Sequence, residues 1–66
     1  MNKKDIINEY LNEEIDGCEH ALNYVREVEN DPDLARPVYI NEIYYEASRR
    51  LVILKILRND LNESKE

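Results

Sequence analysis

The side chains best suited to metal or acid–base chemistry lie around the single histidine. Asp16 precedes His20 by four residues and Glu13 precedes it by seven, so a helix would place all three on one face. Carboxylates and imidazoles can bind divalent cations. Helical di-iron bundles, however, use an acid three residues before the histidine, and that position is Gly17. We therefore expect a solvated acidic face, with no metal and no cofactor.

The other reactive side chain is Cys18, the only cysteine in the chain. Cys18 and His20 are two residues apart, and a helix turns such residues to different sides. Cys18 also falls among apolar positions, where a cysteine usually packs as a small hydrophobic residue. No glycine-rich phosphate loop or nucleophile elbow is present. The sequence thus predicts no catalytic residues and a protein that is not an enzyme.

The length and net charge of the chain exclude further classes of protein. Sixty-six residues with one cysteine and a net charge of −6 make one small domain without a disulfide, for which oligomerisation is a common source of stability. The negative charge argues against direct nucleic-acid binding. Because neither a secretory signal nor a membrane-spanning stretch is visible, we expect a cytoplasmic protein without membrane contact.

The elements that must position these residues are two amphipathic helices. The first is predicted over residues 3–29, with Asn2 as its N-cap. Its apolar positions recur at spacings of three and four and lie on one half of the helix: Ile7, Leu11, Ile15, Cys18, Leu22 and Val25. Gly17 and Ala21 form a notch of small residues beside this stripe. We expect a close helix approach there, with a helix break at Asp16–Gly17 as the alternative.

A connector over residues 30–36 contains both prolines, and Asp31-Pro32 is typical of the start of a short helical turn. Pro37 is then expected to open a second helix over residues 37–61, followed by a frayed tail over 62–66. The second helix is unusual because its segment Leu51–Leu57 is aliphatic at six of seven positions. One face would pack on the first helix, and a nearly opposite face would remain uncovered.

A short connector makes the two helices antiparallel neighbours. Residues 9–19 of the first helix contain five acids and no base, whereas residues 49–58 of the second contain four bases and no acid. An antiparallel hairpin lays these segments side by side. Glu14 and Arg58 fall within the apolar stripes, and we expect both to extend to solvent at the edge; a pair between them is the alternative.

The predicted fold class is therefore all-α, a two-helix antiparallel hairpin, with one apolar face left over. Large exposed apolar patches usually mark interaction surfaces. We expect two hairpins to form a homodimeric four-helix bundle, in which polar substitution of Val52 and Ile56 breaks assembly before it melts the helices. The expected dimer or partner interface consists of Val38, Tyr45, Val52, Ile53 and Ile56.

These features predict a non-enzymatic interaction module, a small regulator or inhibitor that binds an unidentified protein. Tyr24, Tyr39 and Tyr44 lie toward the connector and are candidate partner contacts, because tyrosine is common in binding hot spots. An alternative is that an acidic face imitates nucleic acid and blocks a nucleic-acid-binding or defence protein, as phage-borne or mobile-element-borne inhibitors do. That face consists of Glu9, Glu13, Asp16 and Glu27.

One family resemblance concerns the architecture. Two-helix hairpins of this size resemble the small sporulation aspartyl-phosphatases, whose signature on the second helix is Ser-Gln-Glu-Leu-Asp. The nearest segment here is Ser48-Arg49-Arg50-Leu51-Val52, which agrees only at the serine and the leucine. The resemblance implies a second alternative, a phosphatase-like regulator. Because the glutamine and both acids are missing, it does not extend to the activity.

Overall fold

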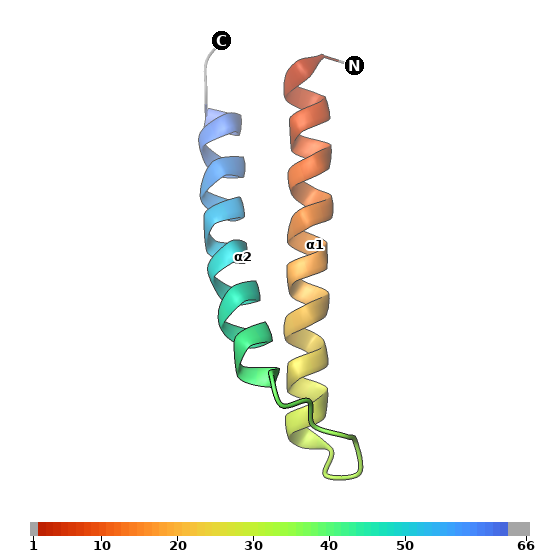
Figure 1. The fold of residues 1–66 in the computed structure, drawn as a ribbon. Coiled ribbons are helices and arrows are strands. Elements are labelled where there is room, and N and C mark those ends of the chain that lie inside the picture. The colour runs from red at the N-terminus through yellow and green to blue at the C-terminus, as the bar shows by residue number, and fades with distance from the viewer. Residues whose placement is uncertain (1, 64–66) are drawn as a thin grey trace.

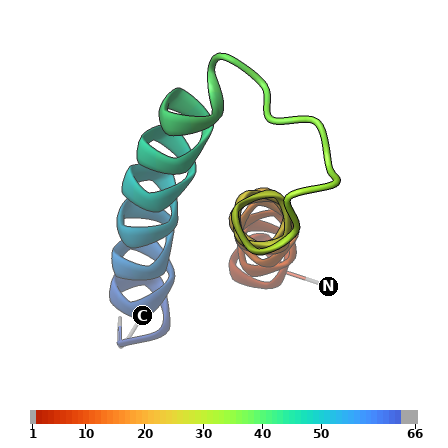
Figure 2. The ribbon, with the colours of Figure 1, turned by 90° about the horizontal axis from the view of Figure 1, so that it is seen from below.

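The computed structural model describes residues 2–63, which form two antiparallel helices joined by a connector, so that the start of the first helix and the end of the second lie at the same end of the molecule (Figure 1). Helix α1 spans Lys3–Asn30 and helix α2 spans Ile40–Glu63. The predicted all-α hairpin with contacting helices is confirmed. The hairpin is a rod with extents of 51 × 19 × 15 Å, and α2 is inclined to α1 (Figure 2).

Helix α1 begins as the sequence predicts, because the Oδ1 of Asn2 accepts a hydrogen bond from the backbone N–H of Asp5 at 2.9 Å. This bond satisfies one of the N–H groups that have no partner within the first turn. The helix runs through Gly17 without interruption, so the alternative of a break at Asp16–Gly17 is wrong.

The connector contains the single turn expected at Asp31-Pro32. The backbone N–H of Leu34 donates to the carbonyl of Asp31, and the Asp31 carboxylate accepts from the N–H of Asp33. The prediction that Pro37 opens the second helix is wrong. Pro37 starts a further turn, in which the Ile40 N–H donates to the Pro37 carbonyl, and the first helical bond runs from Ile43 to Tyr39. Helix α2 therefore begins where its first buried side chain, Ile40, reaches α1.

At its other end, α2 extends two residues beyond the predicted Leu61. There the side chain of Asn8 donates to that of Asn62 at 2.8 Å and links the last turn of α2 to α1. The rest of the predicted frayed tail, residues 64–66, lies outside the described residues. In the described part of the chain, neither helix has a stretch that is long and apolar enough to cross a lipid bilayer.

The seam between the helices contains two small clusters of buried residues. The cluster near the chain ends consists of Leu11, Ile15, Cys18 and Leu54, with Leu51 and Leu61 packed against it. The cluster near the connector consists of Val25, Val28 and Ile40, with Ile43 packed against it. Between them lie two short side chains, those of Ala21 on α1 and Ala47 on α2. The core is thus narrow and divided, which leaves much of the apolar surface of both helices uncovered.

Candidate interaction surfaces

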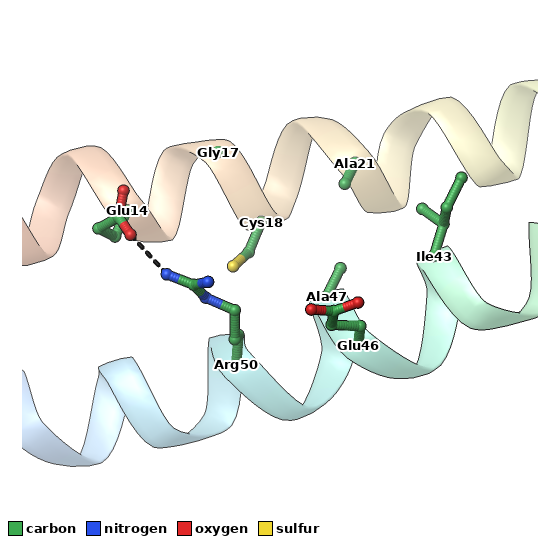
Figure 3. Close-up of a pocket in the computed structure, with 8 residues that line it drawn as sticks. All are labelled: Glu14, Gly17, Cys18, Ala21, Ile43, Glu46, Ala47 and Arg50. Carbon is green, nitrogen blue, oxygen red and sulfur yellow. Dashed lines mark hydrogen bonds and ion pairs between the residues drawn. The ribbon is translucent and has the colours of Figure 1, made fainter.

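A hollow opens on one flank of the hairpin, between the two core clusters. Its volume is about 350 Å³, and both helices line it. Figure 3 shows Cys18 and Ala21 of α1 extending toward α2, from which Ala47 extends toward α1, while Gly17 lies on the part of α1 farther from α2. Because the side chains on both sides are short, they cannot fill the space between two helix backbones, and the seam is left open at its centre.

The hollow corrects the expectation of a close helix approach at Gly17. A Cβ atom built on this glycine would meet nothing within 4 Å, so α2 does not press against the notch. Gly17 and Ala21 face away from the tight part of the seam and toward the open flank. The predicted notch exists, but in the hairpin its surface remains uncovered.

An ion pair lies at the edge of the hollow. The guanidinium of Arg50 donates to the carboxylate of Glu14 at 2.6 Å (Figure 3), and the Glu14 side chain is 34% exposed. The guanidinium of Arg58 instead donates to the side-chain oxygen of Asn12 at 2.8 Å. In the described chain one ion pair, that of Arg50 with Glu14, joins the acidic and basic segments. Glu14 and Arg58 do not pair, since the two belong to separate contacts.

The flank that contains the hollow is also the apolar flank of the hairpin. On α1, Ile6, Tyr10 and Tyr24 lie at helical spacings from Gly17 and Ala21, and on α2, Ile53 and Leu57 lie at such spacings from Arg50. Each of these five large side chains is close to half exposed or more. We call this surface the groove face: Ile6, Tyr10, Gly17, Ala21 and Tyr24 of α1 with Ile53 and Leu57 of α2.

The opposite flank is polar. It carries the contacts of Asn8 with Asn62 and of Asn12 with Arg58, and a second hollow there is lined in part by Tyr44 and Ser48. Ser48, which aligns with the phosphatase signature, is half-buried on this flank.

A second apolar surface lies on the side of α2 that faces away from α1. Tyr45, Val52 and Ile56 are 67%, 58% and 55% exposed, and their spacings of seven and four place them in one row. We call these three residues the outer row. Val38 was expected to extend this row and is almost fully exposed, but it lies in the turn before α2 and is not part of the helical row. Ile53 likewise lies nearer the groove face.

The candidate tyrosine contacts are all exposed, but they do not form one patch. Tyr24 lies on the groove face, whereas Tyr44 lines the hollow on the polar flank. Tyr39 is in the connector just before α2. The ring of Tyr44 packs edge to face with that of Tyr45, with 5.5 Å between centroids. The tyrosines lie near the connector, as the sequence indicates. They do not lie on the same side of the hairpin, because side chains at a similar height along the rod can point to different flanks.

The acidic face occupies the side of α1 away from α2. Glu9, Glu13, Asp16 and Glu27 are all exposed. Among residues 2–63 the ion pairs are those of Arg36 with Glu29 and of Arg50 with Glu14, so no cation of the described chain neutralises this face. The same residues contain no group of three or more His, Cys, Asp and Glu side chains placed to hold a metal ion.

Sequence reasoning missed the groove face as a surface formed by both helices. The sequence did contain an indication of this surface. A second apolar row lies beside the core stripe of the first helix (Ile6, Tyr10, Ala21 and Tyr24), and the second helix has further apolar residues at Ile53 and Leu57. In comparisons with protein-family models, curated proteins and solved structures, nothing matched the chain.

Proposed function

We propose that this chain is a non-enzymatic protein-interaction module that acts as a homodimer and regulates or inhibits a partner protein. The observation that carries the proposal is the excess of exposed apolar side chains on a molecule with a narrow core. Only eight hydrophobic residues among those described are buried, whereas thirteen large ones are exposed. Apolar surface on this scale is typical of interaction sites.

We assign the outer row to the partner protein. Three large apolar side chains in a straight row on one helix offer the kind of surface that an amphipathic helix of another protein can cover. Arg49 and Asp60 are also exposed on α2, so a rim of both charges is available around the row. Polar rims around apolar centres are usual in non-obligate interfaces.

The test is affinity capture with matched variants. Val52→Gln/Ile56→Gln removes the outer row while keeping good helix-forming residues, and circular dichroism checks that the helices remain. Lys55→Gln, on the polar side of the same helix, is the control. We expect wild type and Lys55→Gln to capture the same protein and the double variant to lose it. Equal capture by all three proteins would refute this assignment.

The acidic face supports a second candidate, mimicry of nucleic acid. Its four carboxylates extend over about 27 Å of helix at 1.5 Å per residue and have no cation partner among the described residues. Such a row could occupy the basic surface of a nucleic-acid-binding protein. If Glu13→Lys/Asp16→Lys abolishes capture of such a protein while Glu42→Lys on α2 does not, mimicry is supported. Unchanged capture by the α1 variant refutes it.

A further inference from the structure

We propose that the groove face is the homodimer interface, with α1 of a second copy lying antiparallel across α1 and the twofold axis passing close to Gly17. This inference rests on the proposed function, because it gives the homodimer a place on the chain. It differs from the expectation that Val52 and Ile56 hold the two copies together, and it leaves the outer row available to another protein.

The first argument is the amount of surface. The accessible surface of the chain is 5452 Å², whereas a compact monomer of 7.9 kDa exposes roughly 4,400 Å². The excess of roughly 1,000 Å² is close to the ~800 Å² per partner that a stable interface buries. The radius of gyration of 15.2 Å also exceeds the roughly 11 Å expected for a compact domain of this length. The large radius of gyration reflects the rod shape of the hairpin, and one more hairpin against one flank would cover an area comparable to the excess surface.

The second argument is the pattern of the groove face, which fits a copy of itself. Tyr10 and Tyr24 each lie seven residues from Gly17. A twofold axis at Gly17 therefore sets Tyr10 of one copy opposite Tyr24 of the second copy, and sets the two glycines opposite each other. Large side chains at both ends of a contact with small residues at its centre allow two helices to approach closely. Twofold interfaces require this self-complementarity.

The third argument is that both helices contribute to the groove face. Ile53 and Leu57 of α2 flank the same side of the seam as the apolar row of α1, so a second hairpin would meet a surface two helices wide. The outer row is only one helix wide. The ion pair of Arg50 with Glu14 lies within the groove face, and the unneutralised acids of α1 lie largely outside it. Glu46 of α2 also lines the hollow and is exposed, so each copy brings one acid without an ion pair in the described chain to this flank.

Gly17 provides the test. In the single hairpin a side chain at this position meets open space, and glutamine is a better helix former than glycine. Gly17→Gln should therefore fold as well as wild type while holding the two α1 helices apart. We expect the dimer dissociation constant to rise about 10- to 100-fold, which is the effect of overpacking at a close contact. Sedimentation equilibrium or light scattering over a range of concentrations measures it.

Val52→Gln/Ile56→Gln is the matched control and should leave the dissociation constant unchanged. Circular dichroism on each variant establishes that the helices are retained. A monomeric wild type, or a Gly17→Gln variant that dimerises as wild type does, would overturn the inference. So would loss of the dimer in the outer-row variant alone. Capture of the partner protein is a separate measurement, so a failure of the dimer assignment is distinguishable from a failure of the proposed function.

Discussion

Cys18 belongs both to the buried core and to the lining of the surface hollow. Its thiol packs with Leu11, Ile15 and Leu54 and is 8% exposed, yet the same residue lines the hollow on the groove face. A buried thiol of this kind is shielded from reagents, because the surrounding side chains restrict access to the sulfur. Its reactivity therefore reports on opening of the seam.

We predict that Cys18 reacts with a thiol reagent at least about tenfold more slowly in the native protein than in urea, because labelling requires the seam to open. Absorbance of the released chromophore of a disulfide reagent measures the rate. The comparison protein is Cys18→Ala/Asn23→Cys, whose single thiol lies on the exposed side of α1. Equal labelling rates of the two native proteins would contradict the packing of Cys18.

At the same scale, sequence reasoning succeeded where a contact is local. Asn2 could be identified as a cap because its partner, the N–H of Asp5, is three residues away. The partner of Glu14 could not be identified in this way. Arg50 and Arg58 both lie in the facing helix, and the choice between them depends on helix register and inclination, which no local pattern specifies.

At the scale of the elements, the two helices bury their surfaces unequally. Ile15, at 3% exposure, belongs to the core cluster near the chain ends, while Ile56 on α2 is 55% exposed. Periodicity correctly predicted that α2 has two apolar faces. It could not predict that the seam would open around Gly17, because that depends on Ala47 of the other helix being small as well. The start of α2 at Ile40 likewise depends on where a side chain reaches α1.

The difference in burial between Ile15 and Ile56 predicts that the same substitution at the two positions has different effects on stability. Ile15→Ala should lower the free energy of unfolding by about 2–4 kcal/mol, because it removes buried methylene groups and leaves a cavity. Ile56→Ala makes the same chemical change at an exposed position and should alter it by no more than about 0.5 kcal/mol. Urea titrations at one protein concentration, followed by circular dichroism, give both values. Similar losses in the two variants would mean that Ile56 is covered as well as Ile15.

At the scale of the whole molecule, the hairpin has too little core for its length. A chain of 66 residues is expected to unfold with a free energy of roughly 3–10 kcal/mol, and small domains with few buried residues fall near the lower limit. If a second copy covers the groove face, dimerisation contributes to this free energy. Stability then depends on how often two copies meet, that is, on protein concentration.

We therefore predict that the urea midpoint of the wild-type protein rises with concentration. Where folding and dimerisation are coupled, each tenfold increase in chain concentration adds about 1.4 kcal/mol to the apparent stability of the dimer. Gly17→Gln should show the same rise only at chain concentrations about 10- to 100-fold higher, because its dimer is weaker by that factor. The outer-row variant should retain the concentration dependence of wild type. A wild-type midpoint that stays constant over a hundredfold range would show that the hairpin is stable alone, with its groove face exposed to water.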